Sequence, residues 1–297
     1  MIPVFFGASL LVFLMVFALP GDPVRAIGGQ RALPEATVQA IKDRYRLDEP
    51  LVVQYVAYMG DLLRGDLGES FVSRRPVRDM FTETFPNTAR LALFAVTIEL
   101  IIGASAGILA ALRRRGFLDM LVLVSTTIAI AIPIFVIGFT LQLLIGVEWG
   151  ILPVAGLGDG FQSYILPALV LASVSLAYVA RLTRTGLVES MNEDYVRTAE
   201  AKGLPRHRVV GQHALRNSVL PVMTFLVIDF GFLLAGAIVV EGIFNINGVG
   251  NAVFRAISQR DNLVIISFTL IAVVVFMIVS LIVDLAHTWL DPRLRHD

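Results

Sequence analysis

The sequence contains no cysteine and few charged residues. The absence of cysteine excludes disulfide bonds, thiolate metal sites and cysteine nucleophiles. Charged residues make up 16% of the chain and hydrophobic residues 56%, whereas soluble domains carry roughly 25% charged residues. With a mean hydropathy of +0.77, this composition predicts an integral membrane protein whose main solvent is lipid. The formal net charge of +0 says little about partners, because the side of the membrane on which charges lie carries the information in such a chain.

Motifs for catalysis and for nucleotide hydrolysis are also missing. The sequence has no G-x-x-x-x-G-K-[ST] phosphate loop and no H-E-x-x-H, which excludes the common ATPase and zinc-protease arrangements. His207 and His213 lie in a basic loop, and His287 and His296 lie near the C-terminal end. The chain is therefore predicted to bind no cofactor and to be neither an ATPase nor a membrane-embedded enzyme.

Six apolar runs come close to the roughly 20 residues with which a helix crosses the hydrocarbon core. They lie near residues 2–19, 88–112, 119–146, 165–182, 218–240 and 263–287. The first run has no basic segment before it and no small-x-small cleavage site after it, so it is predicted to be a retained span and not a secretory signal. The sequence thus predicts an all-α membrane protein with six transmembrane helices.

The short loops carry their lysines and arginines on one side of these spans. Basic residues gather between spans two and three, between spans four and five, and after span six, at Arg113, Arg114, Arg115, Arg181, Arg184, Arg197, Lys202, Arg206, Arg208, Arg216, Arg293 and Arg295. Residues 147–164 contain none, and residues 241–262 contain only two. The positive-inside rule then predicts that both termini, including the tail 288–297, are cytoplasmic.

This orientation makes residues 20–87 an extracytoplasmic segment, and its pattern is helical. Pro34 and Pro50 lie where helices begin. An apolar stripe at helical spacing follows, at Val52, Val53, Tyr55, Val56, Met59, Leu62 and Leu63. We expect a small helical cap that packs on the spans, in preference to a direct substrate site.

The stretch from Glu193 to Pro221 is the least apolar part of the second half of the chain. Residues 193–202 are good helix formers, Gly203 is a natural helix stop, and Pro205 can start a second helix that runs towards span five. A solvated basic loop would satisfy the positive-inside rule, but it would not require small residues at Ala199, Ala201 and Gly203. These residues allow another surface to approach closely, so a docking element is predicted.

This stretch, DYVRTAEAKGLPRHRVVGQHALRNSVLP, resembles the cytoplasmic signature loop of ABC-importer permeases of the dipeptide, oligopeptide and nickel branch. The resemblance extends over nearly the whole chain, and its further motifs are PGDP at 20–23, GDLGES at 65–70, PIFVIG at 133–138, ILPALVL at 165–171, AGAIVVEGIF at 235–244 and DPRLRH at 291–296. Several motifs are weak singly, but their order and spacing together are specific.

The resemblance implies a type I permease fold with its core at 88–287 and a coupling loop at 183–217. It implies an inner-membrane subunit that pairs with a second, homologous permease. Two ATPase subunits would bind ATP and magnesium, and an extracytoplasmic binding protein would deliver the solute. No nucleic acid is implied. The positions that match the ATPase-coupling residues of the family are Tyr195, Arg197, Thr198, Ala199, Ala201, Lys202 and Gly203.

The sequence departs from the family pattern at three places. Glu200 stands where this branch often has arginine, and Asn247 stands where proline is usual. The basic stretch that normally precedes the first span is missing. This last departure predicts either a misassigned start or a missing short cytoplasmic helix.

For the substrate, the resemblance to this branch implies peptides, with di- or oligopeptides as the commonest assignment. Nickel complexes and other small solutes remain open, because nothing in the spans selects among them. A secondary transporter is the alternative from another class, but no internal repeat supports it.

Asp66 and Glu69 of the GDLGES motif are predicted to contact the binding protein.

Within the spans, ionisable residues and prolines leave two interpretations open. Glu99, Asp229 and Asp284 would belong either to a polar pathway or proton relay, or to structural pairs across helices, and structural pairs are preferred. Pro133 and Pro167 would either line the pathway or simply bend their helices.

Overall fold

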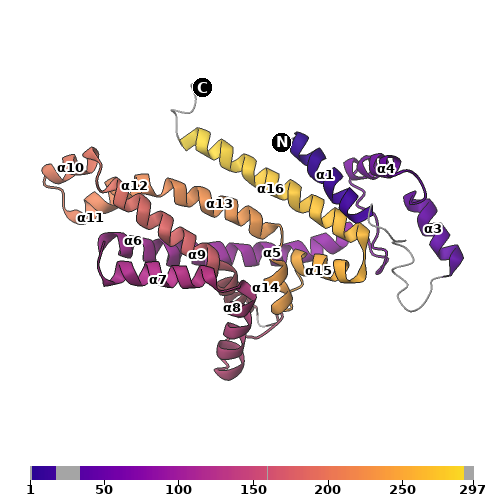
Figure 1. Cartoon of the computed structure of the whole chain (residues 1–297), viewed down its shortest axis with the longest axis horizontal. Coiled ribbons are helices and arrows are strands. Elements are labelled where there is room, and N and C mark those ends of the chain that lie inside the picture. The colour runs from indigo at the N-terminus through magenta and orange to yellow at the C-terminus, as the bar shows by residue number, and fades with distance from the viewer. Residues whose placement is uncertain (1, 18–33, 159, 291–297) are drawn as a thin grey trace. The chain divides into compact units, whose positions relative to one another are not determined.

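The computed structural model describes residues 2–17, 34–158 and 160–290 (Figure 1). All regular elements in these ranges are helices, and the described residues contain one isolated antiparallel β-bridge, between Glu69 and Pro76. The prediction of an all-α protein is confirmed. The motifs at 20–23 and 291–296, and the tail with Arg293 and Arg295, lie outside the described residues.

The chain divides into two compact units. The first comprises Met1–Thr88, Leu234–Gly242 and Asn247–Ile278, and the second comprises Ala89–Leu233, Ile243–Ile246 and Val279–Asp297. The first unit contains α1 (Ile2–Phe17), α3 (Glu35–Tyr45), α4 (Leu51–Leu63), most of α14 (Ile238–Ile243) and α15 (Val249–Gln259). The helices α5 (Val77–Ile98) and α16 (Asn262–Leu290) extend through both units, and α13 (Leu220–Leu234) and α14 each have one end residue in the other unit.

The second unit holds the remaining helices. They are η1 (Glu99–Gly103), α6 (Ala104–Leu112), α7 (Phe117–Ala131), α8 (Ile134–Leu141), η2 (Gln142–Glu148), α9 (Gln162–Ser190), α10 (Asp194–Ala201), α11 (Arg206–Arg208), η3 (Val209–Ala214), α12 (Leu215–Ser218) and α13 (Leu220–Leu234). The segments η1, η2 and η3 are π-helical. Because α5, η1 and α6 follow one another without a break, they form one helical run over 77–112.

Only some of these helices meet the length and hydropathy expected of a membrane span. Three do so singly, at Val77–Leu112, Gln162–Ser190 and Asn262–Val283, within the described residues. The number rises to five if each of two bent pairs counts as one span. The α1 helix has 16 residues, which is shorter than a typical span. The model therefore supports a membrane protein, and the count of six spans stays a prediction.

The prolines in spans three and four act differently. The apolar run over 119–146 consists of two helices, because the chain bends by 101° between Phe117–Ala131 and Ile134–Glu148. Pro133 precedes α8 and lacks a backbone N–H, and Ile132 before it is extended, with φ −87° and ψ 127°, as the residue before a proline prefers. Pro167, in contrast, lies buried inside the unbroken α9 helix.

In the first unit, α4 packs against α1 and α16. Tyr55, Tyr58 and Leu62 contact a cluster of Phe13, Ile266 and Leu270. The hydroxyls of Tyr58 and Ser267 lie 3.2 Å apart, and burial raises the pKa of Tyr58 to about 12 while this hydrogen bond opposes the rise. The packing agrees with the expectation that residues 20–87 contain a helix that packs on a span.

The apolar stripe predicted for α4 is only partly buried. Met59 is buried, but Val52, Val56 and Leu63 are exposed. The buried face instead includes Gln54, whose amide donates hydrogen bonds to the carbonyls of Leu47 and Glu49 at 3.1 and 2.7 Å. The need to satisfy the backbone of the preceding turn therefore rotates a polar residue inward.

A buried carboxylate caps α15 in the first unit. Glu241 is fully buried and accepts hydrogen bonds from the Thr88 hydroxyl at 2.7 Å and from the Asn251 N–H at 2.9 Å. A Cβ atom on Gly248 would lie 2.5 Å from this carboxyl group, so glycine makes the close approach possible. The first N–H groups of α15 thus find a negatively charged acceptor, which helix N-termini favour.

In the second unit, α6 lies close against α9. A Cβ atom on Gly103 would lie 2.9 Å from a methyl carbon of Val179. A Cβ atom on Gly107 would lie 2.5 Å from the Ala180 carbonyl oxygen and 2.6 Å from the Cβ of Thr183. Small residues are required here, as in many membrane helix contacts.

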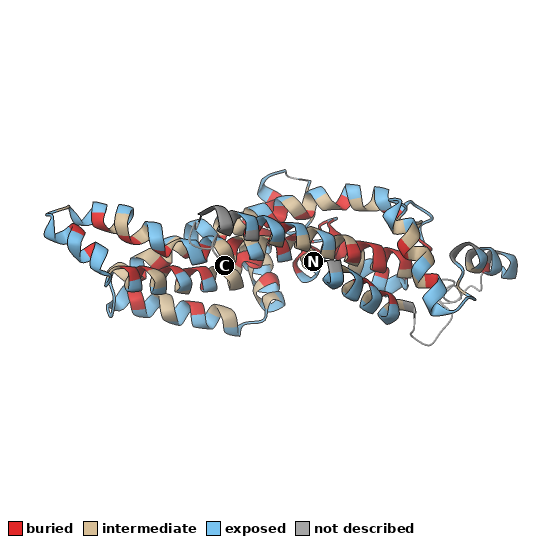
Figure 2. Cartoon of the chain, turned by 90° about the horizontal axis from the view of Figure 1, so that it is seen from above, coloured by how far each residue is buried: buried red, intermediate tan, exposed pale blue. Residues whose placement is uncertain are grey.

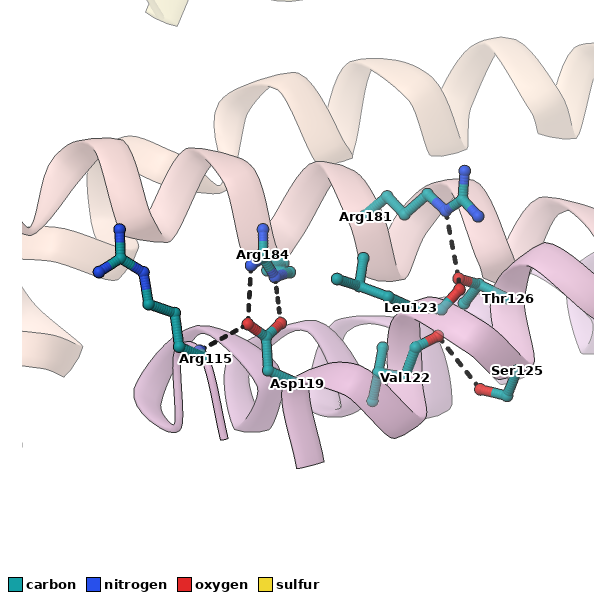
Figure 3. A network of polar contacts seen from close by, with 8 residues as sticks. All are labelled: Arg115, Asp119, Val122, Leu123, Ser125, Thr126, Arg181 and Arg184. Atoms are coloured by element: carbon teal, nitrogen blue, oxygen red, sulfur yellow. Dashed lines mark hydrogen bonds and ion pairs between the residues drawn. The ribbon is translucent and has the colours of Figure 1, made fainter. Parts of the chain in front are cut away.

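Polar contacts join α7 to α9 within the second unit (Figure 3). The Arg184 guanidinium donates to both oxygens of Asp119, at 2.8 Å for the longer contact. The Arg115 N–H donates to the same carboxylate at 2.8 Å, and Arg181 donates to the Thr126 hydroxyl at 3.1 Å. The Asp119 side chain is only 5% exposed. Its contact with Arg184 is bidentate and charge-assisted, which is the stronger type of ion pair.

Loss of the Asp119 charge should destabilise the protein. In Asp119→Asn, the half-buried Arg184 guanidinium loses its anion; because breaking a fully buried pair costs about 3 kcal/mol or more, we expect about 2 kcal/mol here. The matched control is Asp194→Asn, because the Asp194–Arg197 pair is long, at 3.4 Å, and both side chains are largely exposed; its loss should cost under about 1 kcal/mol. The check is the melting temperature of the purified complex, and equal melting temperatures for the two variants would contradict the structural role of Asp119.

Candidate functional site

The α10 helix has its start fixed by local chemistry. Glu193 precedes it in an extended conformation, with φ −74° and ψ 152°. Asp194 lies in the first turn, where a negative charge stabilises the positive end of the helix dipole. The Thr198 hydroxyl donates to the Asp194 carbonyl at 2.8 Å one turn later. The predicted helix over 193–202 is therefore present as Asp194–Ala201.

The turn after α10 is a Schellman motif centred on Gly203. Gly203 has φ +76°, a left-handed conformation that favours glycine. Its N–H donates to the Glu200 carbonyl at 2.9 Å, and the Leu204 N–H donates to the Ala199 carbonyl at 3.3 Å, which is the hydrogen-bond pattern of that motif. The predicted helix stop at Gly203 is confirmed.

A second helical run follows the turn, as the sequence predicts. Pro205 immediately precedes α11, with φ −67° and ψ 144°, and the run continues through η3 and α12 to α13. The run is not one regular α-helix, because its middle turn over Val209–Ala214 is π-helical. The bend between the residues 206–218 and α13 is 48°.

The inner face of α10 packs on its own chain. Val196 and Ala199 are buried in a cluster with Leu187, Val209 and Ala214. Leu204, which follows the Gly203 turn, packs against this cluster. Because Ala199 is only 4% exposed, its small side chain serves this internal contact. The expectation that Ala199 helps to open an outer surface is therefore wrong for the described chain.

Polar contacts also hold α10 to its neighbours. The hydroxyl oxygens of Tyr195 and Ser190 lie 2.5 Å apart, and Ser190 donates to the Ala214 carbonyl at 3.0 Å. One buried serine thus connects the end of α9, the start of α10 and the end of η3. No sequence pattern indicates this role of Ser190, because a serine at the end of a helix is common and its partner Ala214 is distant along the chain.

The outer face of α10 is free in the described chain. The remaining predicted coupling residues are exposed, with Tyr195 38% exposed: Tyr195, Arg197, Thr198, Ala201, Lys202 and Gly203. Figure 2, which colours the chain by burial, shows both buried and exposed positions on the helices at the end of the molecule where α10 lies. A Cβ atom on Gly203 would meet no atom within 4 Å. The result is a short helix anchored on one face and open on the other, with two basic side chains and little bulk near its C-terminal end.

Two of the three acidic residues predicted within the spans lie near each other. Glu99 and Asp229 lie within hydrogen-bonding reach of each other, and the Ser175 hydroxyl donates to Asp229 at 3.0 Å. The two side chains thus face each other where Val96 and Ala104 pack against Val222 and Leu226 of α13. The side chain of Asp284 lies outside the described residues.

The GDLGES motif forms a fixed turn in the first unit. Asp66 is exposed and accepts the Gly68 N–H at 2.8 Å, and Glu69 forms the β-bridge with Pro76. Ser70 is buried, and both its hydroxyl and the Phe71 N–H donate to the Asp261 carboxylate. The motif therefore presents Asp66 to solvent from a turn anchored at Ser70.

Comparisons with known proteins support, over the full chain, the family that the signature loop resembles. Residues 103–296 match the family described as binding-protein-dependent transport system inner membrane component, and residues 2–92 match the N-terminal part of such membrane components. The glutathione transport system permease protein GsiC of Escherichia coli (strain K12) is 40% identical over 299 residues, covering 100% of this chain and 96% of the relative. GsiC of Shigella flexneri serotype 5b has the same identity and coverage.

A solved structure supports the fold. The MetNI methionine ABC transporter in an inward-facing conformation contains a chain with a TM-score of 0.54 and 14% sequence identity, and the match covers 69% of this chain and 95% of that chain. The helical fold of this chain is therefore that of an ABC-importer permease. The chain belongs to the family of binding-protein-dependent transport inner membrane components, in the peptide branch of the ABC-importer permeases, whose members have no ATPase site of their own.

Proposed function

We propose that this chain is one of two homologous permease subunits of an ATP-driven peptide importer and that its α10 helix docks on an ATPase subunit. The two ATPases bind ATP and magnesium, and an extracytoplasmic binding protein delivers the solute. Membership of the family of binding-protein-dependent transport inner membrane components supports these partners. The observation that carries the docking role is the exposure of the outer face of α10 while its inner face is buried in its own chain.

The anchoring of α10 explains how it can transmit movement. An ATPase that closes on ATP shifts the permease only if its contacts differ between the two permease conformations. The contacts of Val196 and Tyr195 join α10 to α9 and η3. A displacement of α10 is therefore passed directly to α9 and, through η3 and α12, to α13. The outer residues from Arg197 to Gly203 form the contact with the ATPase in this proposal.

The membrane arrangement that we propose has six spans and cytoplasmic termini. The α1 helix is the first span, and each of the two bent helix pairs counts as one span. The basic residues of the α6–α7 loop and of the α10–α12 region then lie in the cytoplasm. Residues 20–87 lie outside, where Asp66 and Glu69 contact the binding protein.

The substrates that we propose are short peptides. The relatives that are 40% identical over the full chain are named as permeases of a glutathione transport system, and glutathione is a tripeptide. The resemblance of the signature loop to the dipeptide and oligopeptide branch supports the same class.

Replacement of Gly203 separates docking from folding. In Gly203→Val, a β-branched residue must adopt φ +76°, which costs roughly 1 kcal/mol or more. The added side chain meets no atom of its own chain, so the spans should insert normally. We expect normal membrane abundance, loss of ATPase co-purification or of hydrolysis stimulated by the loaded binding protein, and no uptake of glutathione.

Gly203→Asn is the matched control, because asparagine tolerates the left-handed region and still adds a side chain to the surface. If only the backbone conformation of the turn matters, Gly203→Asn should retain hydrolysis stimulated by the binding protein. If the surface must also lack a side chain at this position, Gly203→Asn should lose the stimulation, as Gly203→Val does. Wild-type uptake by Gly203→Val would show that this turn is an ordinary connector.

The orientation can be tested with single thiols, because the chain contains no cysteine. Arg64→Cys and Arg206→Cys place thiols at exposed positions on opposite sides of the proposed membrane. An impermeant maleimide should label Arg64→Cys in intact cells and should label Arg206→Cys only after the membrane is opened. Ser70 and Ser190 are unsuitable because both are buried. Labelling of Arg206→Cys in sealed cells would contradict the cytoplasmic position of α10.

A further inference from the structure

A pair of carboxyl groups lies inside the second unit, away from the α10 surface. Glu99 is fully buried, and neither of its oxygens accepts a hydrogen bond from a donor in the described part of the chain. Its carboxyl group lies in hydrogen-bonding contact with that of Asp229 on α13. Asp229 accepts one hydrogen bond, from Ser175 on α9 at 3.0 Å, and its second oxygen has no donor among the described residues.

Such a contact requires a proton. Ionised carboxylates only accept hydrogen bonds, so two of them cannot bond to each other. Two negative charges at this separation also repel strongly in a medium of low dielectric constant, and one of the two groups stays protonated. A single shared proton supplies one donor, so that one carboxyl group hydrogen-bonds to the other.

Among the residues that the structure describes, no basic side chain pairs with either carboxyl group. The α13 and α6 helices contain no basic residue, and the charge that acts on Glu99 comes from Asp229. On α9 the nearest basic residue is Arg181, which donates to Thr126 and Thr127 of α7, and on α5 it is Arg90, which is exposed.

The other ionisable groups on the helices packed here are engaged elsewhere. The ring of Tyr178 on α9 lies against Phe225 of α13, with centroids 5.9 Å apart. On α7, Asp119 is held by Arg184. The described side chains on these helices therefore place no positive charge beside the pair, and one bound proton halves its negative charge.

The backbone is irregular at this place. Glu99 is the first residue of the π-helical segment η1, which ends at Gly103 in contact with Val179 of α9. Short π-helical segments are rare and frequently mark functional sites. The extra residue shifts the register of the helix where Glu99 meets α13. Asp229 is only half-buried, so the pair has a route to the surface of the chain.

We propose that Glu99 and Asp229 form an intramembrane binding site for one proton, which is held between the two carboxyl groups and exchanged through Asp229. Calcium and magnesium take about six or more oxygen ligands, whereas this site offers the oxygens of two carboxyl groups and one hydroxyl.

Infrared spectroscopy of the complete complex in lipid nanodiscs tests the site, because the C=O stretch of a protonated carboxyl group differs from that of a carboxylate. The wild type should show a protonated carboxyl signal at neutral pH that disappears at alkaline pH. The double variant Glu99→Gln/Asp229→Asn should lack the signal, and its melting temperature should depend less on pH. The matched control Glu148→Gln changes an exposed carboxyl group and should retain the signal.

A further variant covers the case in which the double variant fails to assemble. Ser175→Ala keeps both carboxyl groups but removes the hydrogen bond that favours ionised Asp229, so its signal should persist to higher pH than in the wild type. Absence of the signal from the wild type at neutral pH, or its survival in the double variant, would overturn the proposal. Loss of the signal when sodium is added at constant pH would identify a metal cation as the occupant and would also overturn it.

Discussion

The close packing of other helices on α9 is the interaction on which the rest of the second unit depends. This helix has 29 residues and contacts η1, α6, α7, α8 and α12. At Gly107 the backbone of α9 approaches so closely that no side chain fits between the helices. Further along, Gly186 brings α9 to Ser218 of α12, where an added Cβ would lie 3.2 Å from a carbonyl oxygen. With its neighbours fixed in this way, α9 can carry a displacement at Ser190 into the spans as a rigid element.

The polar groups within these helices are satisfied in three different ways. Asp119 has a cationic partner in Arg184, and Glu241 accepts hydrogen bonds from Thr88 and from the first turn of α15. Glu99 has neither a cation nor a neutral donor. Since an unpaired charge is costly away from water, the first two carboxylates have structural partners, whereas the third needs a mobile one. This difference separates a binding site from structural ion pairs of similar composition.

Features that depend on local backbone chemistry could be predicted from the sequence. Gly203 and Pro205 specify a turn by their own conformational preferences, and that turn is present. The break at Pro133 was foreseen only as a bend, because its angle of 101° depends on what α7 and α8 contact. The inward position of Ala199 could not be predicted, since a short helix with small residues has no apolar stripe that distinguishes its two faces.

Features that depend on distant partners could not be assigned from the sequence. Glu99 and Asp229 are separated by 130 positions along the chain, and a single sequence gives no sign that they meet. Gln54 lies inside because two carbonyls of the preceding turn need donors, which an apolar pattern does not record. The family resemblance supplied part of what a single sequence does not show, because it predicted a coupling loop at 183–217. It did not indicate which face of α10 is free.

Cross-linking from the outer face of α10 tests the central claim most directly. A photoactivatable reagent attached to Ala201→Cys in the complete complex should cross-link this chain to an ATPase subunit, and the same reagent on Arg64→Cys should not. Both positions are exposed, and the chain has no other cysteine. Absence of ATPase cross-links from position 201, in complexes that retain the ATPase subunits, would contradict the docking of α10.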